Sequence, residues 1–402
     1  MCLAICPMAG GVHNPRPKND DLFSPTRSDG AVFNEHIGWH LRCVVGWRKD
    51  DALRRTCASG GLATWCLETL LETNAVTRVA SVRLAQKHDK GMFEFFAASS
   101  VKELRASAGS IYQPIEISGI LREIARDKTQ RWAIVGVPCL CAGIRNLKHL
   151  REQIPYVLGL ACGMYQNIFY TEMLLAKSGV DGKNARRIEF RRKSDDGPPS
   201  DFRFRGTDNR GPGKEVPYRG LPYYLGKHAF FRLNACNFCK DVFAETADAC
   251  FMDAWLPEYV ADPKGASLVV IRDERLEDVF QSAQAARELF LEDIAAERLV
   301  QSQRSHVKRK QTSIHFRNSS HTNEDAPRYV AMRERLDWWL QQRTQQRSKQ
   351  AWARFGRPYG RLAFWAAMLD LVAAQLLLVQ GPSRFTAFSR KAVSKVVRWL
   401  DS

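Results

Sequence analysis

Four cysteines, widely separated in the sequence, constrain this chain more than any other feature. Cys139 and Cys162 each follow a short apolar run with a strand-like pattern. Cys236 and Cys239 form a distant C-x-x-C pair. Because two strand ends and one C-x-x-C pair can converge on a single point, these residues predict a site with four thiolates. Such a site suits a zinc ion or an iron–sulfur cluster.

The sequence around the first two cysteines alternates between strand and helix patterns. Strand-like runs at residues 131–136 and 156–161 precede the two cysteines, and helical patterns follow at 140–150 and 167–178. In open α/β sheets, binding sites gather at the carboxyl ends of strands. We therefore predict a mixed α/β (α+β) fold whose site lies at the ends of these two strands.

Further elements complete the predicted architecture. Residues 185–219 read as short alternating strands with Gly and Pro turns, which predicts an antiparallel excursion from the core. Residues 247–255 contain two acids and are expected to form a loop, and the chain after residue 300 is expected to be helical. We expect other strands at 42–47, 76–84, 92–98 and 267–272, and helices at 62–71, 117–127, 221–231 and 276–290.

Two loops rich in Gly and Ser are candidates for binding a cofactor beside the cysteines. The first, Ser59-Gly60-Gly61, precedes a predicted helix, where backbone N–H groups attract anions and Gly permits close approach. The alternative is an ordinary Ser N-cap with a tight turn. The second loop, residues 106–112, ends in Tyr112. Its ring either packs against a flat cofactor or belongs to the core.

The spacing of the cysteines bears on the kind of metal. Zinc sites in small modules usually contain two close pairs, whereas only one pair is close here. The isolated Cys139 and Cys162 suit a cluster set into a redox domain with a flavin nearby, although zinc stays open. Cys141 would point to the other side of its helix, so we select Cys139. The cysteines expected to be small buried residues are Cys43, Cys57, Cys66 and Cys250.

The net charge of +17 favours acidic partners, which include nucleic acid, an anionic membrane surface and an acidic protein. Much of this charge follows residue 300, where a solvated basic face is the plainest interpretation. Residues 362–379 are nearly apolar but short for a membrane span, and residues 384–399 form a basic amphipathic pattern that could lie on a membrane. A helical hairpin packed on the body is the alternative.

The 11 cysteines, in the absence of a secretory signal, predict a cytoplasmic protein with reduced thiols. At the N-terminus, Cys2 and Cys6-Pro7 match the last two cysteines and the proline of the ferredoxin run C-x2-C-x2-C-x3-C-P. The first two cysteines of that run would lie upstream of Met1. We therefore expect that this segment does not hold a complete cluster by itself.

In their order along the chain, these motifs resemble those of the coenzyme F420 hydrogenase/dehydrogenase beta-subunit family. That family includes the beta subunits of F420-reducing hydrogenase and plant 7-hydroxymethyl chlorophyll a reductase. The resemblance covers roughly residues 1–290, and residues 253–267 are most similar to bacterial members associated with cell-surface polysaccharide genes. The motifs that carry it are Cys6-Pro7, Ser59-Gly60-Gly61, Gly109-Ser110-Ile111-Tyr112, Val135-Gly136-Val137-Pro138-Cys139, Gly159-Leu160-Ala161-Cys162, Cys236-x-x-Cys239-x-Asp241 and Ala247-Asp248 through Asp253.

The resemblance implies a flavoprotein that contains FAD and a [4Fe–4S] cluster. Leu140 and Met252 depart from the family pattern, which often has Gln and Gly at these positions, and they leave the substrate open. The implied cluster ligands are Cys139, Cys162, Cys236 and Cys239. The residues implied to contact FAD are Ser59, Gly60, Gly61, Gly109, Ser110, Tyr112 and Val137.

The resemblance also divides the chain into three parts. Residues 1–40 are a ferredoxin-like remnant with a loop, residues 41–290 are the FAD and iron–sulfur oxidoreductase core, and residues 291–402 are a basic helical extension. Electrons would pass from ferredoxin or a reduced F420-type carrier, through the cluster and FAD, to a small organic substrate. The positive charge would dock an acidic carrier, and no nucleic acid is expected. No residue stands out in the sequence as a catalytic proton donor, and Tyr112, His149 and Asp253 are the residues considered for that role.

Two other functions explain parts of the sequence. A zinc-stabilised nucleic-acid-binding protein would use the basic tail with its interleaved Trp residues, although that tail is not on the cysteine-bearing region. A non-catalytic electron-transfer or scaffold subunit of a polysaccharide-biosynthesis complex would explain the truncated ferredoxin segment. In that second case the C-terminal helices would make a peripheral contact with the inner membrane.

Overall fold

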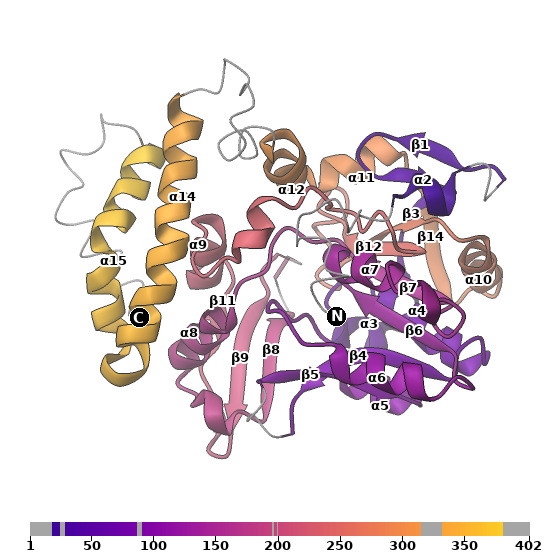
Figure 1. Cartoon of the computed structure of the whole chain (residues 1–402), viewed down its shortest axis with the longest axis horizontal. Helices are drawn as coiled ribbons and strands as arrows, with labels where there is room; N and C mark the ends of the chain where they lie inside the picture. The colour runs from indigo at the N-terminus through magenta and orange to yellow at the C-terminus, as the bar shows by residue number, and fades with distance from the viewer. Residues whose placement is uncertain are drawn as a thin grey trace.

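The structure is a computed structural model, and it describes residues 18–24, 29–86, 91–194, 197–198, 200–314 and 332–380. Cys2, Cys6 and the predicted helix at 384–399 lie outside the described residues. Within them the chain forms a mixed α/β body and a helical hairpin towards its C-terminal end (Figure 1). The predicted fold class is confirmed.

The body is built on a mixed sheet of eight strands in the order β14-β3-β13-β12-β7-β6-β4-β5. Its four inner strands, β12, β7, β6 and β4, run parallel to one another. The strands on either side pair antiparallel. The strands span Arg42–Arg48 (β3), Arg78–Leu84 (β4), Phe93–Ala98 (β5), Trp132–Gly136 (β6), Tyr156–Leu160 (β7), Ala249–Asp253 (β12), Ser267–Ile271 (β13) and Leu289–Asp293 (β14).

Helices cover both faces of this sheet, which explains why its strands are apolar at consecutive positions. Val44 and Val45, adjacent in β3, belong to apolar clusters on opposite faces, and Val157 and Leu158 of β7 do the same. Residues of α6, α7 and α11 fill one cluster, and residues of α4, α5 and α10 fill the other. The helices span Asp51–Thr56 (α3), Leu62–Glu72 (α4), Val101–Ala106 (α5), Ser118–Arg126 (α6), Pro138–Arg145 (α7), Glu274–Ala285 (α10), Ala296–Ser302 (α11) and Arg304–Val307 (α12).

The predicted antiparallel excursion is a small separate sheet. Its strands β8 (Arg187–Arg192), β10 (Gly211–Pro212) and β11 (Val216–Pro217) each pair with β9 (Arg203–Asp208). Helices α8 (Ile168–Ser178) and α9 (Leu221–Lys227) pack beside it in a third apolar cluster. The arginines that make the excursion basic are all matched by carboxylates, in the pairs Arg187–Glu189, Arg191–Asp253, Arg192–Glu215, Arg203–Glu215 and Arg205–Glu189.

Two predictions of secondary structure are wrong. Residues 249–253 are not part of a loop but form β12 in the middle of the sheet, because Ala-Cys-Phe-Met is buried on both faces. The helix predicted at 276–290 ends at Ala285, and β14 follows as an edge strand. Arg287 has a φ of +59° that reverses the chain. Leu289 and Leu291 then alternate towards the core.

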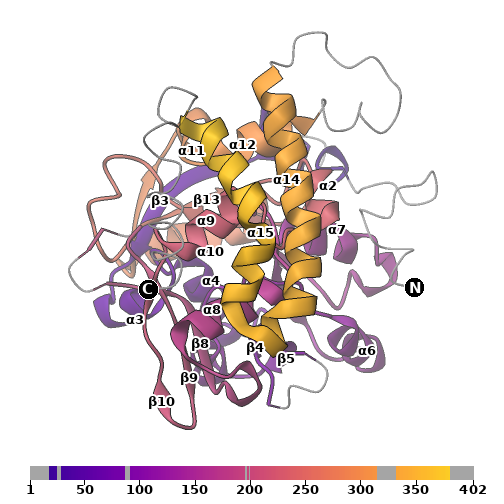
Figure 2. The ribbon, with the colours of Figure 1, turned by 90° about the vertical axis from the view of Figure 1, so that its left-hand side faces the viewer.

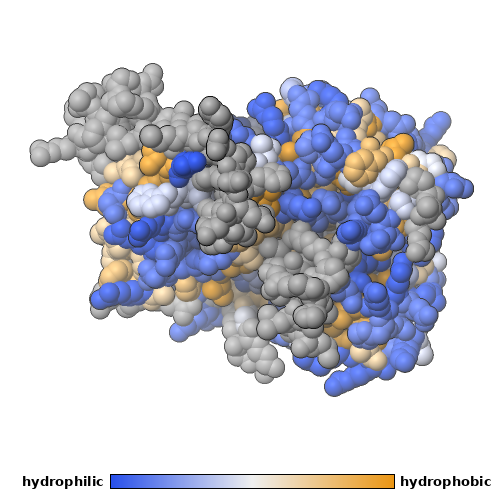
Figure 3. Space-filling view, turned by 45° about the horizontal axis from the view of Figure 1, so that its top comes forward, coloured by the Kyte–Doolittle hydropathy of each residue, from blue (hydrophilic) through white to orange (hydrophobic). Residues whose placement is uncertain are grey.

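A small hairpin, β1 (Val32–Asn34) and β2 (Gly38–His40), lies beside α2 (Asp20–Phe23) at one end of the body (Figure 1). Val32 and Phe33 are exposed on it. Hydrophilic side chains otherwise cover most of the face that Figure 3 shows, with small hydrophobic patches between them. This surface is that of a body whose apolar residues are largely internal.

The described part of the C-terminal extension folds as a helical hairpin that packs against the body. This is the second of the two arrangements considered for the chain after residue 300, and it agrees with an apolar segment at 362–379 that is short for a membrane span. Helices α14 (Met332–Ala351) and α15 (Arg357–Gln380) flank a π-helical turn, Trp352–Gly356, and lie side by side (Figures 1 and 2). The buried Phe364 ring stacks on Phe231, with 5.7 Å between ring centroids. None of the helices in the described ranges combines the length and apolar character needed to cross a membrane.

The variant Phe364→Ala should loosen this hairpin, because it removes a fully buried ring from an aromatic cluster. We expect the free energy of unfolding to fall by about 3–5 kcal/mol, measured by urea denaturation with Trp fluorescence. Leu362→Ala is the control, since Leu362 lies on the same helix but is 64% exposed. Equal losses in the two variants would contradict the packing described above.

Candidate functional site

A cavity of about 960 Å³ opens where β6, β7 and β12 end. It is lined by Gly136 and Val137 at the end of β6, by Leu160 to Cys162 at the end of β7, and by Asp253 at the end of β12. The predicted cofactor-binding residues that line it are Ser59, Gly61, Gly109, Ser110, Tyr112 and Val137, together with the predicted ligands Cys139 and Cys162. The structure therefore brings both Gly/Ser loops and two of the four cysteines to one cavity.

The first loop presents the start of α4 to this cavity. Gly61 is the N-cap of α4, with a φ of +86°, and no side chain caps the helix there. The residues of the first turn, Leu62 to Thr64, line the cavity, so their backbone N–H groups are available to an anion. Ser59 is not the N-cap, and its hydroxyl instead donates to the carbonyl of Ala266 at 2.6 Å.

Gly60 lies behind the cavity wall rather than in it. A Cβ atom at this position would come within 2.6 Å of the Gly46 carbonyl oxygen and 2.8 Å of the Ser267 nitrogen. The loop can therefore lie this close to β3 and β13 only with Gly at position 60. Lys193 also holds the loop, because its buried ammonium donates to the carbonyls of Arg54 and Ser59, each at 2.8 Å. Burial lowers the pKa of Lys193 to about 8.

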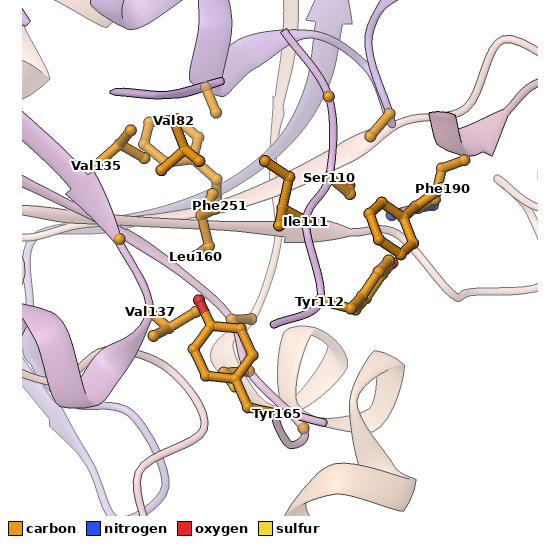
Figure 4. Close-up of a pocket in the computed structure, with 18 of the residues that line it drawn as sticks. Val82, Ser110, Ile111, Tyr112, Val135, Val137, Leu160, Tyr165, Phe190 and Phe251 are labelled. Carbon is orange, nitrogen blue, oxygen red and sulfur yellow. The ribbon is translucent and has the colours of Figure 1, made fainter. Parts of the chain in front are cut away.

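The second loop contributes an aromatic wall. Gly109 has a φ of +152°, and Tyr112 packs edge-on against Phe190 with 5.5 Å between ring centroids. Burial raises the pKa of the Tyr112 hydroxyl. Figure 4 shows Tyr112 and Phe190 on one side of the cavity, and Val135, Leu160 and Phe251 on the other. A flat ring system fits between such surfaces.

Tyr165 also points into the cavity, and sequence reasoning missed it (Figure 4). Its backbone N–H donates to Sγ of Cys236 at 3.3 Å. Burial, followed by the nearby thiols of Cys162 and Cys139, raises the pKa of the Tyr165 hydroxyl well above its usual value. Tyr165 therefore lies between the cavity and the C-x-x-C pair. The sequence feature that could have indicated a role at this site is the position of Tyr165, three residues after Cys162.

The four predicted ligands share one largely buried region. Cys139 is in the first turn of α7, and Cys162 follows β7, where its N–H donates to the Val242 carbonyl at 2.9 Å. Burial, and then the thiols of Cys162, Cys239 and Cys236, raise the pKa of Cys139 to about 12. Each thiol is therefore close enough to Cys139 to influence its ionisation.

The chemistry of these donors fits an iron–sulfur cluster. The four thiols come from three segments of the body, and they would lose their protons on binding metal. In the described part of the chain, no three His, Cys, Asp or Glu side chains converge closely enough to hold a metal ion. The assignment of Cys139, Cys162, Cys236 and Cys239 as ligands stays a prediction.

The remaining described cysteines lie in the core. The thiol of Cys141 is buried and lies 3.5 Å from the Gly136 carbonyl oxygen, which it approaches as a donor. It faces the apolar cluster beneath α7 and not the cavity. The expected burial is confirmed for Cys43, Cys57, Cys66 and Cys250.

An ion pair between the excursion and the sheet forms another wall of the cavity. The guanidinium of Arg191 donates two hydrogen bonds to the Asp253 carboxylate, both of 2.8 Å, and lies 4.6 Å from the centre of the Phe202 ring. Of the three candidate proton donors, Tyr112 and Asp253 line the cavity. His149 is exposed and is not among the lining residues, so the structure does not bring it to the site.

The basic run at 304–310 is only partly a solvated face. Arg304 and Lys308 are exposed, as expected, but Lys310 is buried. Its ammonium donates to the carbonyl of Cys162 at 3.0 Å and to the carbonyl of Asp241. Burial lowers the pKa of Lys310, but the neighbouring Cys162, Cys239 and Asp241 outweigh this effect and raise it. No residue pattern near position 310 of the sequence indicates that Lys310 is buried.

A polar face of α14 holds the loop that carries Cys236 and Cys239. The side-chain amide of Gln345 donates to the carbonyl of Arg232 at 3.0 Å and to Oδ1 of Asn234 at 2.7 Å. Its oxygen accepts from Asn237 at 2.8 Å. Ser348, three residues later on the same helix face, accepts from the N–H of Phe231 at 3.0 Å. The C-terminal hairpin therefore sets the position of the C-x-x-C pair.

Two family models match the chain. The model described as coenzyme F420 hydrogenase/dehydrogenase, beta subunit N-term, matches residues 43–122, and the corresponding C-terminus model matches residues 129–297. The curated coenzyme F420-dependent sulfite reductase of Methanocaldococcus jannaschii is 23% identical over 254 residues, which cover 58% of this chain. The match covers only 36% of that relative, so this chain spans about a third of its length.

A solved structure shows a similar fold. It is a chain of the F420-reducing [NiFe] hydrogenase complex from Methanosarcina barkeri, with a TM-score of 0.54. The alignment covers 74% of this chain and 100% of that chain, at 17% sequence identity. At this identity the likeness concerns the fold alone. Residues after 297, which include Lys310 and α14, lie beyond both family models.

The variant Gln345→Ala should loosen the C-x-x-C loop, because it removes three hydrogen bonds to that loop from a buried side chain. We expect the free energy of unfolding to fall by about 2–3 kcal/mol. We also expect Cys236 of the metal-free protein to be alkylated faster, as measured by mass spectrometry of the labelled peptide. Gln346→Ala, at the exposed neighbouring position, is the control. An unchanged rate at Cys236 in Gln345→Ala would rule out this support.

Proposed function

Because the chain belongs to the coenzyme F420 hydrogenase/dehydrogenase beta-subunit family, we propose that it is an iron–sulfur flavoprotein oxidoreductase. Electrons would pass from an acidic carrier, either ferredoxin or a reduced F420-type deazaflavin, through a [4Fe–4S] cluster and FAD to a small organic substrate. The observation that carries this proposal is that Cys139 and Cys162 line the same cavity as the two Gly/Ser loops. A cluster and a flavin held there would be neighbours.

The cavity supports FAD as its occupant. When bound, FAD would supply exchange between one-electron carriers and two-electron substrates. The uncapped start of α4 offers N–H donors and a positive helix end for its diphosphate. The apolar wall at Val135, Leu160 and Phe251 and the aromatic wall at Tyr112 suit the faces of its ring system. Arg191 provides a fixed cation, already paired with Asp253, at the edge of the same space.

The four cysteines support the cluster. They come from α7, from the end of β7 and from the C-x-x-C loop, which are parts of the folded body and not of a small metal-dependent module. Tyr165 lies between the C-x-x-C pair and the cavity. In the proposed arrangement Tyr165 would exclude water from the space between the C-x-x-C pair and the cavity.

We also propose an acidic electron carrier, a cytoplasmic location and a peripheral membrane contact. The net charge of +17 supports docking of an acidic carrier, because complementary charge accelerates productive encounter. A cytoplasmic location follows from the cysteine content, and residues 384–399 would make any peripheral contact with the inner membrane. The net charge, the cysteine content and the pattern at 384–399 that support these three points are features of the sequence.

Anaerobic purification tests the proposal directly. We expect a yellow-brown protein that contains iron, acid-labile sulfide and FAD, and whose visible absorption bleaches on addition of reduced ferredoxin or reduced F420. A colourless protein with one zinc ion and no flavin would refute the proposal. A protein that contains both cofactors but is reduced by neither carrier would instead support an electron-transfer or scaffold subunit with another donor.

The variant Cys236→Ser should remove the cluster absorption, because it replaces a predicted ligand with a much weaker donor. We expect iron and sulfide to fall below one tenth of the wild-type content, measured on anaerobically purified protein. Cys66→Ser is the control, since Cys66 lies on the buried face of α4 and is fully buried in the core. Loss of iron in both variants to the same extent would show that the ligand set is wrong.

The variant Thr64→Glu should weaken FAD binding without unfolding α4. A carboxylate in the first turn of a helix favours the helix, but at the cavity wall it would repel the FAD diphosphate. We expect the Kd for FAD to rise about tenfold, which is ~1.4 kcal/mol, in a fluorescence titration of the apoprotein. Thr69→Glu adds the same charge to α4 away from the cavity and should bind FAD normally.

A further inference from the structure

Lys310 is a buried cation beside the predicted cluster ligands, and it comes from a part of the chain that neither family model covers. It lies in the π-helical turn Lys308–Thr312 that follows α12. Its ammonium donates to the carbonyl of Cys162 at 3.0 Å and to the carbonyl of Asp241. One acceptor therefore belongs to a predicted ligand, and the other lies two residues after the predicted ligand Cys239.

The hydrogen bonds themselves do not explain why a charge is buried here. An ammonium transferred from water to a protein interior loses several kcal/mol of hydration, which backbone carbonyls alone restore poorly. Cys239 donates in turn to the Asp241 carbonyl at 3.7 Å, so its sulfur and Lys310 share that acceptor. The predicted ligands around Lys310 would become thiolates on binding iron. A cluster bound by four thiolates carries net negative charge, and its reduced form carries one more.

The neighbours of Lys310 strengthen this arrangement. Arg309, the preceding residue, donates to Nδ1 of His306 at 3.2 Å. A Cβ atom on Gly163 would lie within 2.7 Å of both side chains. The end of α12 and the turn after it therefore pack directly on the backbone that follows Cys162, and a larger residue at position 163 would require these side chains to shift.

We propose that Lys310 is the counter-charge of the cluster, and that it stabilises the reduced cluster more than the oxidised one. This inference rests on the proposed function, because it requires that a cluster binds to the four cysteines. Net charge and hydrogen bonds near the sulfurs set the potential of iron–sulfur clusters. A buried cation is screened much less than an exposed one. Removal of the Lys310 charge should therefore make the cluster harder to reduce.

The test is a potentiometric titration of the anaerobically reconstituted full chain, followed by electron paramagnetic resonance of the reduced cluster. The variants are Lys310→Met, which removes the charge, Lys310→Gln, which removes the charge but keeps a donor, and Lys310→Arg, which keeps the charge. Lys308→Met is the matched control, because it removes one positive charge from the same turn at an exposed position. Iron and sulfide content is measured for every variant.

For the two neutral variants we expect at least a tenfold shift of the equilibrium towards the oxidised cluster, which is about 59 mV for one electron. Lys310→Arg and Lys308→Met should stay close to wild type. Should the neutral variants bind no cluster while Lys310→Arg does, the charge is needed to hold the cluster, which also supports the proposal.

Three results would overturn the inference. The first is a wild-type potential in Lys310→Gln at full cluster content. The second is an equal shift in Lys308→Met, and the third is loss of the cluster in Lys310→Arg as well, which would indicate a role of shape alone. A wild-type protein that binds no iron and sulfide would instead refute the proposed function itself. The two failures are therefore distinguishable.

Discussion

The parallel pairing of β6, β7 and β12 is the constraint on which the rest of the site depends. It places Gly136 beside Gly159, and Gly159 beside Cys250, so that the three strands end at nearly the same level. A Cβ atom on Gly159 would lie 2.3 Å from Cβ of Ala244, so the loop that follows the C-x-x-C pair packs directly on the strand. Cys139, Cys162 and Asp253 reach one cavity because these strands end together.

Sequence patterns were sufficient to predict those strands and helices whose residue pattern lies within the element itself. The strands before Cys139 and Cys162 are continuous apolar runs with a helix after each, which is the pattern of inner strands in a covered sheet. β12 was not predicted as a strand because the two acids at its ends, Asp248 and Asp253, suggested exposure to solvent. Asp248 is instead buried and paired with Arg145. β14 was not predicted because its first residues continue the apolar pattern of α10. The reversal there depends on one residue, Arg287, in a backbone conformation that composition does not reveal.

The sequence singled out residues of both Gly/Ser loops together with Cys139 and Cys162, and these residues line one cavity. Both Gly/Ser loops and the four cysteines are marked by unusual residue types at fixed spacing. The side chains that surround them, such as Tyr165, Arg191 and Lys310, are ordinary residues whose surroundings arise from long-range packing. Arg191 and Lys310 looked like parts of basic surface runs. Each is instead held by partners more than sixty residues away in the sequence.

The hydrogen bonds between α14 and the C-x-x-C loop also bear on when the site can form. Gln345 follows Asn237 by 108 residues, so during synthesis the loop with Cys236 and Cys239 is made long before its support. Chains fold progressively from the N-terminus as they are synthesised. The sheet with Cys139 and Cys162 can be complete while the other two cysteines still lack their final frame. Binding of the proposed cluster to all four cysteines would therefore follow translation of α14.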